Sequence, residues 1–174
     1  MAMKKLTENS NPDQKTIRIL IIEDDPISAA VLESLLRELG FIDITMVTSS
    51  KEAIKVFFEK DFDIIFSDIN LADSNGIDLT RHYRTVNPRK DTPIICCSTA
   101  IEKHRRECIE AGMSDFLDKP VAPDQLRRIL ECWLPSYRAE NFNREGGGKP
   151  PQYLFIKPFR FSSTVNCTLN EKLK

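Results

Sequence analysis

Short apolar runs alternate with longer amphipathic segments, five times over, between residues 17 and 134. The third run has an unbroken apolar stretch, Ile64-Ile65-Phe66, which suits a strand that is covered on both faces of a parallel sheet. In the segments between the runs, apolar residues recur at three- and four-residue spacing, which predicts helices. This alternation with short loops predicts an α/β fold with a doubly wound, five-stranded parallel sheet and helices on both faces. The expected strands are 17–22, 42–47, 63–68, 93–97 and 116–117, and the expected helices are 26–39, 50–59, 75–83, 101–111 and 122–134.

The helical periodicity also predicts which side chains pack inward. In helix 26–39 these are Ile27, Ala30, Val31, Leu35 and Leu39. In helix 50–59 they are Ala53, Ile54, Phe57 and Phe58. Residues with capping side chains stand where the first three helices begin, namely Asp25, Ser49 or Ser50, and Asn75.

Length and composition fit one folded domain with flanking segments. The chain has 174 residues, of which 41% are hydrophobic and 29% charged, as in ordinary globular proteins. We expect residues 1–15 to be a disordered arm and residues 16–135 to be the folded domain. Residues 136–174 carry an excess of basic side chains, a Gly/Pro-rich linker and an aromatic strip at 153–161. They match no output domain, and we expect a linker-like tail there.

Charge, hydropathy and cysteine content narrow the class further. The net charge of −1 gives no indication of nucleic-acid binding. The apolar runs are too short for a secretion signal or a membrane span, so we expect a cytoplasmic protein. The five cysteines form no CxxC pair and are odd in number, and we expect all of them to be reduced thiols.

Polar side chains of particular types follow four of the five predicted strands. In a parallel sheet the carboxyl ends of these strands lie at one edge, where α/β proteins carry their sites. These side chains are Glu23, Asp24 and Asp25 after the first strand, Asp68 at the end of the third, Ser98 and Thr99 after the fourth, and Lys119 after the fifth.

Carboxylates at one edge favour a metal site. Two of them about 4 Å apart repel by roughly 4 kcal/mol at an effective dielectric constant near 20. Mg²⁺ relieves this repulsion, prefers oxygen ligands, and neutralises charge in phosphoryl transfer. Asp68 could then act as a nucleophile that forms an acyl phosphate. Lys119 and Thr99 would hold phosphoryl oxygens.

Each of these residues also has an ordinary structural interpretation. Asp24, Asp25 and Asp68 could simply cap helices, and Thr99 could be a turn hydroxyl. Lys119 could be a solvated surface lysine. The site hypothesis depends on the whole set occurring together at the strand ends.

The same stretches resemble the receiver domain of two-component response regulators, over about residues 17–134. The order and spacing of four motifs agree, and the last of them is most similar to receivers of hybrid histidine kinases. The motifs are Ile19-Leu-Ile-Ile-Glu-Asp-Asp25, Ile64-Ile-Phe-Ser-Asp68, Ser98-Thr-Ala100 and Ala111-Gly-Met-Ser-Asp-Phe-Leu-Asp-Lys-Pro120.

The resemblance implies a flavodoxin-like strand order of 2-1-3-4-5, a cis peptide before Pro120, and Mg²⁺ as the cofactor. It implies that Asp68 is the phosphoacceptor and that Asp24 is a direct metal ligand, as is the backbone carbonyl of Asn70. Glu23 would act through a water molecule. The remaining implied roles are Thr99 as the switch hydroxyl, Phe116 as the switch aromatic residue and Lys119 as the phosphate-sensing lysine.

By the same resemblance, the expected partners are a histidine kinase or a histidine phosphotransfer protein. A homodimer through residues 101–134 is a further expectation, without nucleic acid and without a membrane span. We expect a signalling domain that catalyses only its own phosphorylation and dephosphorylation, not an enzyme. The chain departs from the family at Ala72 and Ser74, and its loop after Thr99 is about two residues short.

Two other functional classes share some of these features. Haloacid-dehalogenase-type phosphohydrolases also use a strand-end aspartate and Mg²⁺, but Asn70 stands where they have their general acid. A binding module that works without phosphorylation usually lacks an acidic residue or the lysine, and this chain has them all. Nucleotide binding has no support, because residues 146–150 fail the P-loop pattern. His82 and His104 show no metal-ligand spacing.

Overall fold

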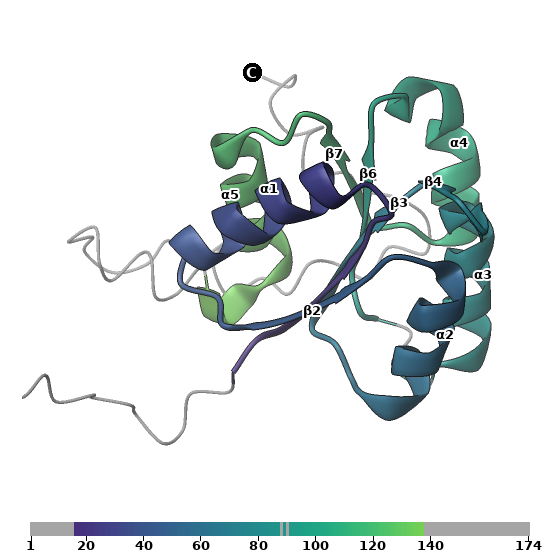
Figure 1. Cartoon of the computed structure of the whole chain (residues 1–174), viewed down its shortest axis with the longest axis horizontal. Helices are drawn as coiled ribbons and strands as arrows, with labels where there is room; N and C mark the ends of the chain where they lie inside the picture. The colour runs from purple at the N-terminus through teal and green to yellow at the C-terminus, as the bar shows by residue number, and fades with distance from the viewer. Residues whose placement is uncertain (1–15, 88, 90, 138–174) are drawn as a thin grey trace, which may run out of the picture.

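The protein, described here from a computed structural model, forms a parallel sheet between two layers of helices (Figure 1). The structure describes residues 16–87, 89 and 91–137. The strands lie in the order β2-β1-β3-β6-β7, and every neighbouring pair is parallel. Their bounds are β1 Arg18–Ile22, β2 Asp43–Val47, β3 Ile64–Asp68, β6 Ile94–Ser98 and β7 Asp115–Asp118. The doubly wound sheet and its expected strand order are therefore confirmed.

A short antiparallel hairpin lies between β3 and the next helix, and the sequence did not predict it. It consists of β4, Asn70–Leu71, and β5, Ser74–Asn75.

Five helices cover the sheet. Their bounds are α1 Pro26–Glu38, α2 Ser50–Glu59, α3 Gly76–Val86, α4 Ile101–Ala111 and α5 Pro123–Trp133. Helices α1 and α5 pack on one face, and α2, α3 and α4 pack on the other (Figure 1). The sheet thus has a first core beneath α1 and α5 and a second core beneath α2, α3 and α4. Side chains of β1 alternate between them, with Ile19 and Ile21 in the first core and Leu20 and Ile22 in the second.

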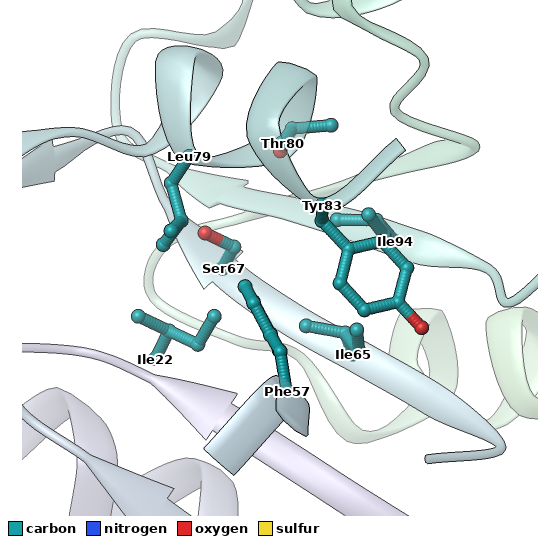
Figure 2. Close-up of a pocket in the computed structure, with 8 residues that line it drawn as sticks. All are labelled: Ile22, Phe57, Ile65, Ser67, Leu79, Thr80, Tyr83 and Ile94. Atoms are coloured by element: carbon teal, nitrogen blue, oxygen red, sulfur yellow. The ribbon is translucent and has the colours of Figure 1, made fainter. Parts of the chain in front are cut away.

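The second core is closely packed around two aromatic rings. Phe57 of α2 and Tyr83 of α3 meet edge to face, with ring centroids 4.6 Å apart. Figure 2 shows these rings with Ile65 of β3 around a gap beneath the helices. The gap is too narrow to hold a water molecule, so it is a packing feature and not a binding cavity.

The predicted N-caps are confirmed. Asp25, Ser49 and Asn75 each accept a backbone hydrogen bond from the first turn of α1, α2 and α3. Helix α4 has no side-chain hydrogen bond at its N-cap, Ala100. It ends at Gly112, whose φ of 95° is in the left-handed region that favours glycine.

The predicted inward face of α1 is only partly right. Leu35 and Leu39 pack against the core, but Ile27 is 74% and Val31 44% exposed. The side chains buried on this helix are Ala29, Leu32 and Leu36. Apolar residues occur on nearly all sides of this helix, so its periodicity fits more than one face. The same error affects α2, because Phe57 is buried but its neighbour Phe58 is 70% exposed.

The packed core continues past the predicted domain end at residue 135. Tyr137 is buried, and its ring lies 5.1 Å from the ring of Phe41. Residues 1–15 and 138–174, with the predicted arm and most of the tail, lie outside the described part of the chain. In the described part, no helix is long and apolar enough to cross a membrane.

The expectation of five reduced thiols is also wrong. Cys96, Cys97 and Cys108 are free and buried, but Cys132 is disulfide-bonded. The odd count and the missing CxxC motif say nothing about pairs that are distant in sequence. Cys167 lies outside the described residues.

Candidate functional site

The carboxyl edge of the sheet gathers the predicted acidic residues. Glu23 and Asp24 follow β1, and Asp68 ends the neighbouring strand β3. One carboxylate oxygen from each of the three lies within 4.8 Å of the others. Glu23 and Asp68 are buried and Asp24 is half-buried, so their mutual repulsion is poorly screened by water.

Lys119 compensates part of this charge. Its ammonium nitrogen lies 2.5 Å from Glu23 Oε2 and 2.6 Å from Asp68 Oδ2. Burial raises the pKa of Glu23, and the hydrogen bond from Lys119 offsets this only in part. Burial lowers the pKa of Lys119, but its hydrogen bonds to Asp68 and Glu23 outweigh this effect and leave the pKa raised. Lys119 is therefore charged, and its one ammonium group is shared by two of the three carboxylates, those of Glu23 and Asp68.

The hairpin loop orients two of the carboxylates. The backbone N–H of Ala72 donates to Asp24 Oδ2 at 2.8 Å, and that of Asn70 donates to Asp68 Oδ1 at 3.2 Å. Asp73, farther along the loop, accepts hydrogen bonds from the backbone N–H groups of Ser50 and Lys51, which fastens the loop to the start of α2. Sequence reasoning missed this connection, because nothing in the pattern indicates which helix a loop aspartate caps.

Asp25 does not belong to the cluster. Its Oδ2 accepts from the backbone N–H of Ser28 at 2.8 Å and from the Ser28 hydroxyl at 2.6 Å. Those hydrogen bonds lower the pKa of Asp25. The side chain is exposed and acts as the cap of α1, as the helix pattern predicted.

Gly76 is a second residue that sequence reasoning missed. A Cβ atom at this position would stand 1.9 Å from the carbonyl oxygen of Asp68. The Gly76 N–H donates to the carbonyl of Ile69 at 2.8 Å, so the loop folds back directly against the end of β3. The available signal was a glycine directly after the capping residue Asn75, where any side chain would need space that a sequence does not reveal.

The remaining predicted residues lie on the β6 and β7 side of the edge. Thr99 follows β6 and is exposed, while Phe116 of β7 is buried. The guanidinium of Arg105, on α4, lies 4.5 Å from the centre of the Phe116 ring, a cation–π distance. Arg105 also forms an ion pair with Glu102 at 2.7 Å. The peptide between Lys119 and Pro120 is cis, as the resemblance implied.

The donor set fits a hard divalent cation. Carboxylate and carbonyl oxygens are the ligands that Mg²⁺ prefers, and three carboxylates around one ammonium leave an excess of negative charge. His82 is exposed on α3 and His104 is half-buried on α4, and neither lies in the acidic cluster.

Comparisons with known proteins agree with this geometry. Residues 19–131 match the response regulator receiver domain family. The chain is 32% identical over 117 residues to the aerobic respiration control sensor protein ArcB of Escherichia coli. This alignment covers 66% of this chain and 15% of ArcB. It is 29% identical over 148 residues to the transcriptional regulatory protein ZraR of Salmonella typhimurium, covering 79% of this chain and 33% of ZraR.

A solved structure with a similar fold is the receiver domain of the sensor histidine kinase PA1611 from Pseudomonas aeruginosa. Its TM-score is 0.63 at 32% identity, over 68% of this chain and 98% of that domain. That structure has a magnesium ion coordinated in its active site cleft.

The fold, the acidic edge and these matches define the class of protein. The chain belongs to the response regulator receiver domain family, the receiver domains of two-component signalling systems. It spans only about a sixth to a third of the length of these two relatives.

Proposed function

We propose that Asp68 accepts a phosphoryl group from the phosphohistidine of a histidine kinase or histidine phosphotransfer protein. The observation that carries this proposal is the position of Asp68, whose carboxylate shares the Lys119 ammonium with Glu23 beside Asp24. The phosphorus–nitrogen bond of the donor breaks as a carboxylate oxygen of Asp68 bonds to phosphorus, and the imidazole leaves.

Asp24, Asp68 and the backbone carbonyl of Asn70 would hold Mg²⁺, with Glu23 acting through a water molecule. When bound, Mg²⁺ supplies neutralisation of the charge on the phosphoryl oxygens. The Ala72 N–H fixes the orientation of Asp24, and the Asn70 N–H fixes that of Asp68. Both contacts come from the hairpin loop, which therefore positions two carboxylates together.

Lys119 and Thr99 are the groups that sense the phosphoryl oxygens in this proposal. Phosphorylation converts Asp68 into a group with about −1.5 to −2 charges, if it behaves like other phosphorylated side chains. Lys119 then bonds a phosphoryl oxygen, and the Thr99 hydroxyl donates to another. A shift of Thr99 changes the space beside Phe116, which alters the surface of residues 101–134. That surface is the proposed partner or self-association face.

Several broader properties belong to the same proposal. The domain would act as a cytoplasmic element of a phosphorelay, with no nucleic-acid partner and no substrate turnover beyond its own phosphorylation and dephosphorylation. The matches to a sensor protein and to a transcriptional regulator support a signalling role. For the residues beyond Tyr137, the linker-like tail that the sequence predicted over 136–174 remains part of this proposal.

The test is phosphorylation of the full chain with Mg²⁺ and an acyl phosphate, followed by mass spectrometry to find the modified residue. Label should appear on Asp68 and should be labile to hydroxylamine. Asp68→Asn should abolish it, while Asp25→Asn, a neighbouring exposed carboxylate, should retain it. Label at the wild-type level in Asp68→Asn would refute the assignment.

A further inference from the structure

Two thiols meet in the core between β6 and α4. Cys96 lies in β6 and Cys108 in α4, both fully buried, and their sulfur atoms are 3.9 Å apart. Both are free thiols. The Sγ–Sγ distance allows a weak S–H···S hydrogen bond, and the residues are twelve apart in the sequence.

Cys97 provides an internal contrast. It is as buried as Cys96 and adjacent to it, but it belongs to the core on the opposite face of the sheet. Its sulfur contacts the carbonyl of Ile95 at 3.8 Å. The strand therefore directs one of two neighbouring thiols toward α4 and the other away from it.

The geometry is close to that of a disulfide. A disulfide bond is about 2.05 Å long, so the sulfur atoms must approach by about 1.9 Å. Rotation of one cysteine side chain, or a small movement of α4, can supply this displacement.

We propose that Cys96 and Cys108 are a redox-sensitive pair, which a hydroperoxide converts to a disulfide that fastens α4 to β6. One thiol, as its thiolate, attacks the terminal peroxide oxygen, and the O–O bond breaks to give a sulfenic acid and an alcohol or water. The second thiol displaces hydroxide from the sulfenic sulfur, which forms the S–S bond and releases water. Two thiols are oxidised by two electrons in total, the peroxide is reduced by two, and a thiol reductant reverses the change.

Cys108 is the better first nucleophile. The hydrogen bond between the two thiols lowers the pKa of Cys108, whereas it raises that of Cys96 together with burial. Because both side chains are buried, the peroxide must enter through local opening of α4, and the rate of oxidation follows that opening.

The two thiols lie beside Phe116 and α4, through which phosphorylation of Asp68 is expected to act. This part of the inference rests on the proposed function. Cys96 is the register partner of Phe116 across β6 and β7. Arg105, which covers Phe116, is on the same helix as Cys108. Just after α4, the Gly112 carbonyl oxygen accepts hydrogen bonds from the guanidinium of Arg84 at 2.8 and 3.0 Å. A disulfide would fasten the last turn of α4 to β6, next to the Gly112 carbonyl that Arg84 already holds.

The first experiment maps the bond itself. The full chain is treated with hydrogen peroxide, digested without reduction and analysed by mass spectrometry with fragmentation. A peptide pair joined through Cys96 and Cys108, lost on treatment with dithiothreitol, is the expected result. Cys97→Ala should keep this link and Cys96→Ala should lose it.

Three outcomes would overturn the thiol site. These are a Cys108 link to Cys97 as abundant as that to Cys96, oxidation to sulfinic acid without a link, and no link while α4 exchanges its amide hydrogens freely. If Cys96→Ala does not fold, Cys108→Ser gives the same comparison from α4, and the wild-type mapping decides by itself.

The second experiment measures the consequence. Amide exchange over residues 101–118 is compared with and without beryllium fluoride, in the reduced and in the cross-linked chain. The response should be present when reduced, largely lost when cross-linked, and restored by dithiothreitol. An equal response in both forms would overturn the role of the pair in signalling. A missing response in the reduced chain would instead count against the proposed function, and the mapping would still decide the thiol site.

Discussion

Gly76 and Asp68 are in direct backbone contact, since a Cβ atom on Gly76 would stand 1.9 Å from the Asp68 carbonyl oxygen. The atom that a side chain would meet is main chain at the end of a central strand, so it cannot move aside by a rotamer change. The start of α3 thereby sets the position of the proposed phosphoacceptor.

Gly76→Ala should therefore displace the end of β3. We expect a loss of more than about 1 kcal/mol in the free energy of unfolding and a lower rate of phosphorylation at Asp68. Denaturant unfolding and labelling by an acyl phosphate measure the two effects. Gly40→Ala is the matched control, because Gly40 has a positive φ of 93° but nothing within 4 Å. It should cost stability and leave labelling of the folded protein unchanged; equal labelling rates in both variants would contradict the contact's role.

Lys119 should compete with a cation for the acidic cluster. Its ammonium occupies oxygens of Glu23 and Asp68 that belong to the same group of carboxylates. Lys119→Met should be less stable without Mg²⁺, because breaking a buried ion pair typically costs about 3–5 kcal/mol. It should also gain more in melting temperature when Mg²⁺ is added. Lys103→Met, an exposed lysine on α4, is the control, and a smaller Mg²⁺ shift in Lys119→Met than in this control would refute the competition.

Asp24 and Asp25 are adjacent, but only Asp24 should be needed for Mg²⁺ binding. Asp24→Asn should weaken Mg²⁺ binding, because the Asp24 carboxylate lies in the acidic cluster. Titration of each variant with Mg²⁺ measures the affinity. Asp25→Asn should keep Mg²⁺ binding, since the Asp25 carboxylate caps α1. A greater loss of Mg²⁺ affinity in Asp25→Asn would reverse this assignment.

The Asp25 cap should make the stability of the protein depend on pH. The pKa of Asp25 is lowered in the folded protein by its hydrogen bonds to Ser28, so its contribution to stability is present above the usual aspartate value of 3.8 and is lost as the pH falls through the lower folded pKa. Unfolding curves in this acid range should be less pH-dependent in Asp25→Asn than in the wild type. An unchanged pH dependence would show that the cap is not charge-assisted.

Tyr137 should contribute to the stability of the domain. Its buried ring lies against Phe41, beyond the boundary that the sequence predicted. Tyr137→Ala should cost about 3 kcal/mol, by comparison with other large aromatic truncations in cores. Ser136→Ala, an exposed neighbour, should cost little. A chain ending at Pro135 that is as stable as one ending at Tyr137 would contradict this packing.

Thr99 should transmit phosphorylation without being needed for it. Thr99→Ala should still be labelled at Asp68 but should lose the change in amide exchange over residues 101–134 that beryllium fluoride causes. Its side chain is exposed, so the substitution should barely change stability. Thr85→Ala, an exposed threonine on α3, should behave as the wild type. A full response in Thr99→Ala would mean that the signal takes another route.

The sequence predicted those features that depend on local pattern. Apolar runs and helical spacing were enough for the five-stranded sheet, and the capping residues located the starts of α1, α2 and α3. The carboxyl ends of parallel strands share an edge, which is why Glu23, Asp24, Asp68 and Lys119 could be placed together before any coordinates were known.

Features that depend on contacts distant in sequence were missed. Asp115 of β7 is buried, and its carboxylate accepts a hydrogen bond from the Trp133 indole of α5 at 3.0 Å. No local sequence pattern indicates this contact. The face of α1 was partly wrong because apolar side chains surround that helix, so the helical period alone does not choose between Ile27 and Ala29. Gly76 required knowledge of what lies beside it, which a turn pattern does not contain.

The hydrogen bonds of Asp73 make the two flanks of the site unequal. They fasten the hairpin loop to α2 on one side of Asp68, where the Ala72 N–H also binds Asp24. On the other side, Thr99 is exposed at the end of β6. The loop on the α2 flank of Asp68 is therefore held by hydrogen bonds, whereas the Thr99 side chain on the β6 flank is open to solvent. We therefore expect a change of charge at Asp68 to produce more movement on the β6 flank of the sheet than on the α2 flank.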